Sequence, residues 1–76
     1  MTPEQCRAAR AWLDLSQDEL AAAARVSQST VRDFEKGRRV PIANNLEAMR
    51  VVLEQRGIGF VEDETLGISF NPRPKV

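Results

Sequence analysis

The stretch that decides the fold is residues 16–37, SQDELAAAARVSQSTVRDFEKG, which contains two helix starts close together. Ser16 and Glu19 form a capping box, in which each side chain can accept a hydrogen bond from the other residue's backbone N–H. Ser27 predicts the second start, because its hydroxyl can accept from the backbone N–H two or three residues later. The pattern predicts two short helices, at about residues 17–23 and 28–36.

The apolar residues of this stretch predict how the two helices pack. Only about four residues separate the helices, so they must cross steeply, and small side chains must lie where they meet. Ala21 and Ala24 fit that need. A buried stripe is then expected from four larger apolar side chains: Leu20, Val26, Val31 and Phe34.

The second of these helices keeps a polar and cationic face, with Gln28, Ser29, Arg32 and Lys36 exposed. Gln can pair with N6 and N7 of adenine, and Arg with O6 and N7 of guanine. The N-terminal residues of a helix in the major groove reach base edges. We expect DNA base contacts from Gln28, Ser29 and Arg32; the alternative is an ordinary solvated helix face.

Three short segments give this region a resemblance to the helix-turn-helix of the phage repressor and Cro type, the Xre family. They are LSQDELA at 15–21, VS at 26–27 and FEKG at 34–37. With the helix before them and Pro41 after them, the resemblance covers about residues 3–56. It implies a mainly α, lambda-repressor-like bundle of four helices and the function of a DNA-binding transcriptional regulator, a repressor by type.

The resemblance also assigns roles to residues outside the base-reading face. A helix N-terminus favours an anion, so Gln17 at the start of the first of the two helices is expected to meet a phosphate. Arg10 is expected to form an ion pair with Glu35 that fixes the angle of the reading helix. The predicted DNA backbone contacts are Gln17, Ser27, Lys36, Arg38, Arg39 and Asn44. The alternative is that Gln17 is an ordinary polar residue of the first turn and that the side chains at 36, 38, 39 and 44 are only solvated.

Two further helices flank this region. Thr2 can cap a helix over residues 3–13, and Gln5 completes its capping box. A fourth helix is expected from about residue 44 or 45 to residue 56, where Gly57 ends it. Its buried face would consist of Leu46, Met49, Val52 and Leu53.

Asp14 and Arg25 stand where the family usually has glycine. The position of Asp14, just after a helix, often needs a left-handed backbone. Asp tolerates that conformation better than most residues. Arg25 is the larger departure, and it predicts some strain or an altered turn.

After residue 57 the apolar period changes to two, which predicts a β-hairpin with strands at about 58–61 and 67–70. A lone hairpin is barely stable, so its apolar face must rest on the helices or on another subunit. Trp12 is a candidate for the surface on which it rests. We expect a dimer interface at Ile58, Phe60, Ile68 and Phe70. The chain then divides into a helix-turn-helix bundle at 1–57, a hairpin at 58–71 and a flexible tail at 72–76.

The charge is balanced but segregated. Eleven Lys and Arg residues oppose eleven Asp and Glu residues, for a net charge of zero. Residues 25–39 nevertheless hold five basic side chains against two acidic ones, whereas an acidic cluster, read as a solvated loop, lies at 62–64. The distribution favours DNA binding by one surface.

The composition argues against several other functions. Cys6 is the single cysteine and there is no histidine, so no internal disulfide and no Cys/His metal site is expected. Cys6 is expected to pack in the core, with a redox sensor as the alternative. We expect no catalysis, cofactor, small-molecule substrate, signal peptide or membrane span, and therefore a cytoplasmic protein.

These observations together predict a sequence-specific regulator that binds double-stranded DNA as a homodimer on a two-fold operator. At 76 residues the chain buries only about 60% of its unfolded surface, so a second copy would also stabilise it. The alternative is a protein-interaction module on the same scaffold, such as an antitoxin or an anti-activator, whose hairpin would bind a protein partner.

Overall fold

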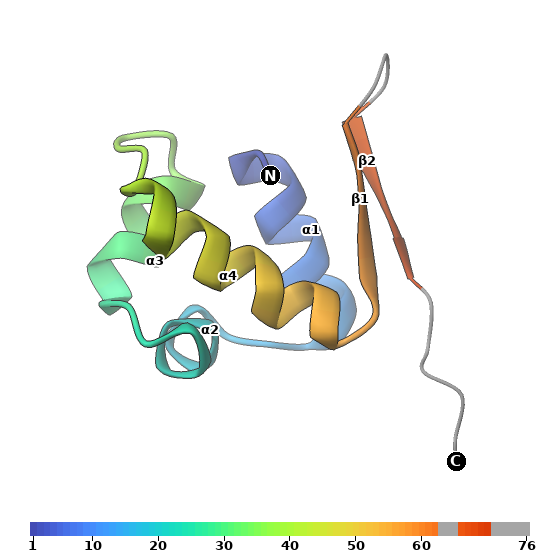
Figure 1. Ribbon diagram of the computed structural model, residues 1–76, viewed down its shortest axis with the longest axis horizontal. Coiled ribbons are helices and arrows are strands. Elements are labelled where there is room, and N and C mark those ends of the chain that lie inside the picture. Colours follow the sequence, from blue (N-terminus) through green and yellow to red (C-terminus); the bar gives the residue numbers. More distant parts are fainter. Residues whose placement is uncertain (63–65, 71–76) are drawn as a thin grey trace.

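The computed structural model describes residues 1–62 and 66–70. In these residues four helices precede an antiparallel pair of strands, which confirms the predicted mainly helical fold. The helices form one bundle, and the hairpin stands at one end of it (Figure 1). The elements are α1 Pro3–Leu13, α2 Gln17–Ala24, α3 Gln28–Glu35, α4 Ala43–Gln55, β1 Ile58–Glu62 and β2 Leu66–Phe70.

Local capping explains the first two helices. The Thr2 side chain accepts from the Gln5 backbone N–H, and the Gln5 side chain accepts from the Thr2 backbone N–H. Ser16 and Glu19 form the same reciprocal pair at the start of α2. Both predicted capping boxes are therefore confirmed.

The turns that end α1 and α2 are left-handed. Asp14 has φ 53° and Arg25 has φ 58°, and both follow the last residue of a helix. An L-residue in this conformation costs about 1 kcal/mol relative to its preferred regions. Asp14 therefore has the left-handed backbone expected there, and the left-handed Arg25 accounts for the strain predicted in its turn.

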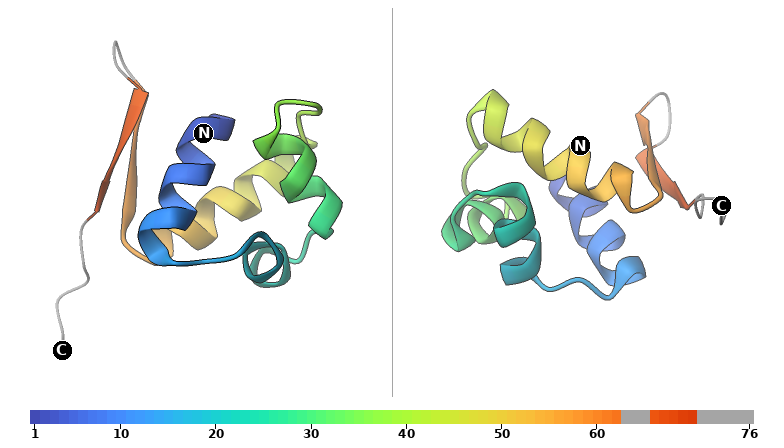
Figure 2. Two further views of the ribbon diagram at one scale, coloured as in Figure 1. Left: turned by 180° about the vertical axis from the view of Figure 1, so that it is seen from behind. Right: turned by 60° about the horizontal axis from the view of Figure 1, so that its bottom comes forward.

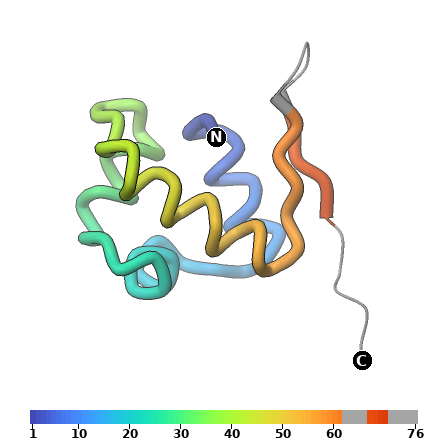
Figure 3. The backbone as a smooth tube through the Cα atoms, viewed as in Figure 1, coloured from blue at the N-terminus to red at the C-terminus, as the bar shows by residue number. Residues whose placement is uncertain are grey.

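The boundaries of α3 and α4 differ slightly from expectation. The Ser27 hydroxyl accepts from the Thr30 backbone N–H, which is one of the two donors predicted for it. α3 ends at Glu35, one residue before the predicted end. α4 begins at Ala43, before the asparagines, because Ile42 takes the capping position without a side-chain hydrogen bond. The connector between α3 and α4 loops out at the end of the molecule (Figure 3).

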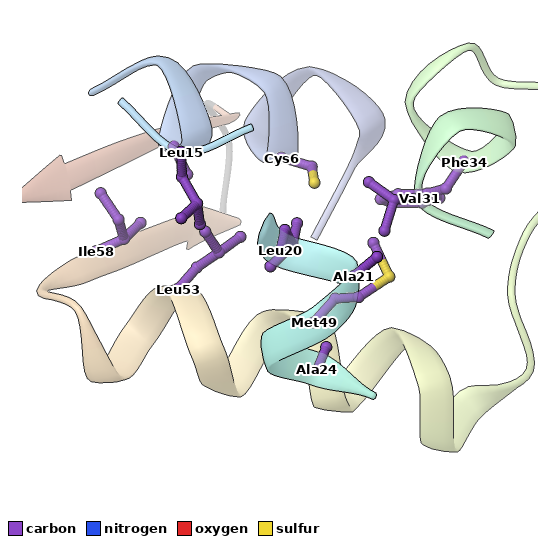
Figure 4. Close-up of a cluster of buried hydrophobic side chains, with 11 residues drawn as sticks. Cys6, Leu15, Leu20, Ala21, Ala24, Val31, Phe34, Met49, Leu53 and Ile58 are labelled. Carbon is purple, nitrogen blue, oxygen red and sulfur yellow. The ribbon is translucent and has the colours of Figure 1, made fainter. Parts of the chain in front are cut away.

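The core lies where the helices meet (Figure 4). Leu20, Val31 and Phe34 are buried as predicted, whereas Val26 is only partly buried. On α4, Met49 and Leu53 are fully buried, and Leu46 and Val52 pack partly buried against the same cluster. The remaining core residues are Cys6, Ala9, Leu15, Ala21, Ala24 and Ile58.

The hairpin pairs within one chain, with Phe60 opposite Ile68 and Ile58 opposite Phe70. β1 contacts α4 and β2 contacts α1. The Trp12 and Phe70 ring centroids lie 5.5 Å apart, so the hairpin does rest on Trp12. The tail at 72–76 and most of the acidic cluster at 62–64 lie outside the described residues.

The four residues predicted at a dimer interface differ in how much of their surface remains exposed. Ile58 is 3% exposed and belongs to the core of its own chain. The Arg50 guanidinium lies over the Phe60 ring, 5.7 Å from its centroid, and Phe60 and Ile68 are partly buried. Phe70 is the most exposed of the four. A surface open to a second copy therefore lies on the β2 side of the hairpin.

Gln5 attaches the hairpin to the bundle. Its side-chain nitrogen donates to the Val61 carbonyl at 2.9 Å and to the Gly67 carbonyl at 2.8 Å. Its side-chain oxygen completes the capping box with Thr2. One buried amide thus caps α1 and holds both strands with all its hydrogen-bonding groups in use.

None of the helices in the described residues is long and apolar enough to cross a membrane.

Replacing Gln5 by Glu separates these two functions of the amide. The carboxylate keeps an acceptor for Thr2 but presents an oxygen to two carbonyls that lose their donor. We expect Gln5→Glu to lower the free energy of unfolding by about 1–3 kcal/mol in urea titrations. Glu4→Gln, on the exposed neighbour, is the control and should change it by less than about 0.5 kcal/mol. Equal stability of the two variants would contradict the hairpin attachment.

Candidate nucleic-acid interface

α2 and α3 pack against each other, and two small residues of α2 are buried in the bundle. Ala21 is 1% exposed and Ala24 is 8% exposed, and Arg25 turns the chain toward the cap of α3. α3 buries Val31 and Phe34 on its inner side. Its outer side faces away from the bundle, at the end opposite the hairpin (Figures 1 and 2).

The three residues predicted to read bases all lie exposed on α3. Gln28 and Ser29 occupy its first turn, and Arg32 follows one turn later. The Arg32 side chain is 50% exposed, and its Nε lies 4.0 Å from Asp33 Oδ1, a loose contact that leaves donors available. The Ser29 hydroxyl lies 3.0 Å from the Ser27 hydroxyl, so part of its hydrogen-bonding capacity is used locally.

Most of the residues predicted to contact the DNA backbone are exposed. Ser27, Lys36, Arg38, Arg39 and Asn44 are exposed, and Asn44 is the second residue of α4. Thr30 and Asp33 of α3 line a pocket of about 220 Å³ together with Arg39, so the connector between α3 and α4 lies beside α3. Within the described residues, no ion pair joins Lys36, Arg38 or Arg39 to a carboxylate.

Gln17 lies differently from the other predicted backbone contacts. Its side chain is partly buried and its nitrogen donates to Glu35 Oε1 at 3.0 Å. One amide hydrogen is thus bound to Glu35 inside the bundle. The predicted phosphate contact at Gln17 therefore relies mainly on the helix terminus and on the second amide hydrogen.

Arg10 of α1 and Glu35, the last residue of α3, form an ion pair inside the bundle. Arg10 Nε and Nη2 donate to the two Glu35 carboxylate oxygens, each at 2.6 Å, which is bidentate geometry. The Cys6 thiol also donates to Glu35, at 3.1 Å. Arg10 donates a further hydrogen bond to the Leu15 carbonyl at 2.9 Å. The carboxylate is thus bound by side chains of α1 and α2 at the same time.

Sequence reasoning missed three of these partners. Arg7 donates to the backbone carbonyl of Glu35, at the C-terminal end of α3. The Cys6 and Gln17 contacts with the carboxylate were also not anticipated. Helical spacing could have indicated Cys6, because it lies four residues before Arg10 and so on the same face. No local signal relates Gln17 to Glu35.

The electrostatics of the cluster favour a charged pair. Burial acts to raise the pKa of Glu35, but hydrogen bonds from Arg10, Gln17 and Cys6 outweigh it and hold the pKa below its usual range. The hydrogen bond to Glu35 raises the pKa of Arg10. Burial, and then the same carboxylate, raises the pKa of the Cys6 thiol. The expected core role of Cys6 is confirmed, since a sensor needs an accessible thiolate.

Glu35→Gln should remove a pH-dependent part of the stability. A carboxyl with a lowered folded pKa stabilises the fold above its unfolded pKa, about 4.3, and loses that contribution as the pH falls through the folded value. At pH 7 we expect the variant to unfold more easily by about 3 kcal/mol, because Arg10 keeps its charge without a partner. The difference should shrink below about pH 4.

Urea titrations from pH 3 to pH 7 measure this difference. Glu54→Gln is the matched control, since Glu54 forms an exposed ion pair with Arg50 at 3.1 Å. It should change the free energy of unfolding by less than about 0.5 kcal/mol. A gap between wild type and Glu35→Gln that stays constant with pH would contradict the assignment.

Comparison with known proteins agrees with this geometry. A model of the helix-turn-helix family matches residues 7–54, which include all of α2 and α3 and most of α1 and α4. No curated protein matches the chain significantly. The family match covers more than half of the 76 residues. This chain belongs to the helix-turn-helix family of DNA-binding regulators.

Proposed function

We propose that this protein is a sequence-specific transcriptional regulator, acting as a repressor, that binds a two-fold DNA operator as a homodimer. The observation that carries the proposal is the outer face of α3, where Gln28, Ser29 and Arg32 are exposed. Glu35, the last residue of the same helix, is buried and bound to Arg10. A rigidly held helix with hydrogen-bonding side chains pointing outward suits a major groove.

Base recognition would come from the first turns of α3. Gln28 offers an amide that matches adenine, and Arg32 offers a guanidinium that matches guanine. Ser29 can donate to or accept from several base edges. α2 would cross the DNA backbone with its N-terminus toward a phosphate.

Affinity would come mainly from the surrounding cations. Arg38, Arg39 and Lys36 lie in or beside the connector that runs along α3. Each phosphate that a cation neutralises releases counterions, so binding should weaken steeply with salt. The net charge of zero does not oppose this, because residues 25–39 hold five basic side chains against two acidic ones.

A repressor that acts by occupying its operator must recognise more base pairs than one copy of this chain can contact. A single recognition helix contacts on the order of four or five base pairs, too few to select one site in a genome. Two copies on a two-fold site double that length. The half-sites would then lie about one helical turn, roughly 34 Å, or a multiple of it apart.

Selection from random DNA fragments followed by sequencing tests the proposal. We expect an enriched palindromic motif, in which the two half-sites are inverted repeats of each other. No enrichment, together with a protein that co-purifies with this chain, would favour the protein-interaction module instead. Transcription from a promoter that overlaps the motif then separates repression from activation.

Arg32→Ala tests base reading. We expect a loss of about 1–3 kcal/mol in binding to the selected site and a relaxed preference at one base position. Fluorescence anisotropy against a panel of single-base variants of the site measures both effects. If the variant loses the same affinity for every sequence, Arg32 contacts the backbone and not a base.

Arg38→Ala tests phosphate contact. We expect weaker binding to all sequences by a similar factor, and a slope of log affinity against log salt that falls by about one unit. Anisotropy titrations between 50 and 200 mM salt would provide the slope. Arg50→Ala is the control cation, because the Arg50 guanidinium lies over Phe60 of the hairpin, and it should leave the slope unchanged. An unchanged slope for Arg38→Ala would remove Arg38 from the proposed contacts.

A further inference from the structure

The end of the molecule that carries the hairpin exposes aromatic surface. Trp12 of α1 is 63% exposed, and Phe70 of β2 is 38% exposed. Together with Ile68 and Ser69 they line a pocket of about 260 Å³ between the helix and the strand. Large aromatic side chains gain much free energy when they leave water. Trp12 contacts Phe70 of its own chain and still has most of its surface available to a partner.

The strand beside this pocket has an open edge. In the described part of the chain, β2 has β1 as its single strand neighbour, so its other edge carries backbone N–H and C=O groups without a strand partner. Such an edge can pair antiparallel with the same edge of another copy about a two-fold axis. Figure 2 shows the hairpin at the margin of the molecule, where a second strand could approach it.

The charges of this surface also favour a second copy. A two-fold axis places a patch against itself, so like charges within the patch would repel. The residues that line the pocket, Trp12, Ile68, Ser69 and Phe70, carry no charge. A charged partner such as DNA would find nothing to complement there.

The position of the surface suits the proposed function. α3 lies at one end of the molecule and the hairpin at the other (Figure 1). Two copies joined at the hairpin end would leave the outer faces of both α3 helices open to DNA. A contact closer to α3 would compete with DNA for the same side chains.

We infer that Trp12, Ile68, Phe70 and the outer edge of β2 form a two-fold interface with a second copy of this chain, with Trp12 as its anchor. The inference supplies the contact surface for the homodimer of the proposed function and rests on that function for its purpose. A standard interface takes about 800 Å² from each partner, a minor share of the 5173 Å² that the chain exposes. Large aromatic residues at the centre of such interfaces carry most of the binding energy.

Sedimentation equilibrium over a range of concentrations tests the interface without DNA. The wild type should approach twice the chain mass of 8.5 kDa. Trp12→Ala should raise the dimer dissociation constant at least about tenfold, as expected for an interface anchor. Val40→Ala is the matched control, because Val40 is 76% exposed but lies in the connector near α3. A wild type that stays monomeric, or a Trp12→Ala variant that dimerises like the wild type, would overturn the inference.

A second variant keeps the result independent of any change in folding. Trp12 is the only tryptophan, so its emission should shift to shorter wavelength as the wild type associates. Phe70→Ser retains this probe and should keep the emission at long wavelength at concentrations where the wild type has shifted. Circular dichroism checks that both variants retain the helical bundle. An equal shift in Phe70→Ser would place the interface elsewhere.

DNA titrations distinguish failure of the interface from failure of the proposed function. Trp12→Ala should bind an isolated half-site as tightly as the wild type and lose cooperativity on the two-fold site. If the dimer depends on Trp12 but random-fragment selection enriches no DNA motif, the interface is supported and the proposed regulatory function is wrong. Cooperative binding that survives Trp12→Ala would overturn the interface and leave the regulator standing.

Discussion

The carboxylate of Glu35 is the constraint on which the position of α3 depends. A buried carboxylate is costly unless it is paired and hydrogen-bonded. Here Arg10 binds both oxygens, and Gln17 and Cys6 add one hydrogen bond each. Arg7 binds the backbone carbonyl of the same residue. A charge on α3 is thus satisfied only when α1 and α2 occupy their observed positions, which links the orientation of α3 to the whole bundle.

This link explains how so short a helix can present a defined surface. α3 spans Gln28–Glu35, and an isolated helix of that length would be marginal in water. Ser27 fixes its first turn through the Thr30 N–H, and Val31 and Phe34 anchor its inner side in the core. The ion pair then limits rotation about the helix axis. Side chains on the outer face therefore hold their positions without contacts of their own.

Features that depend on neighbouring residues could be predicted from the sequence. The capping boxes at Thr2 and Ser16 are local, so their patterns predicted the helix starts correctly. The predicted start of α4, at residue 44 or 45, is too late. Asparagine is a strong capping residue, but in the structure Ile42 takes the capping position without a side-chain hydrogen bond. The exposed face of α3 followed from helical spacing, and the family match supports its general role.

Features set by tertiary packing could not be predicted in the same way. Alternation in the hairpin marked Ile58 and Phe60 as apolar, but it cannot distinguish a face that covers its own helices from one that meets another chain. Ile58 lies in the core because β1 contacts α4. The attachment of both strands by Gln5 joins residues far apart in sequence, and a capping glutamine gives no sign of it. The Gln17 contact with Glu35 is of the same kind.

The left-handed turn at Arg25 bears on how such domains are recognised. Glycine at this position would remove about 1 kcal/mol of backbone strain, but it would also widen the unfolded ensemble by a comparable free energy. The two effects nearly cancel, so selection has little reason to preserve glycine in the turn. A search keyed to that glycine would pass over chains built like this one. The spacing between the two serine caps and the Arg10–Glu35 pair do not depend on that glycine, and both are present in this chain.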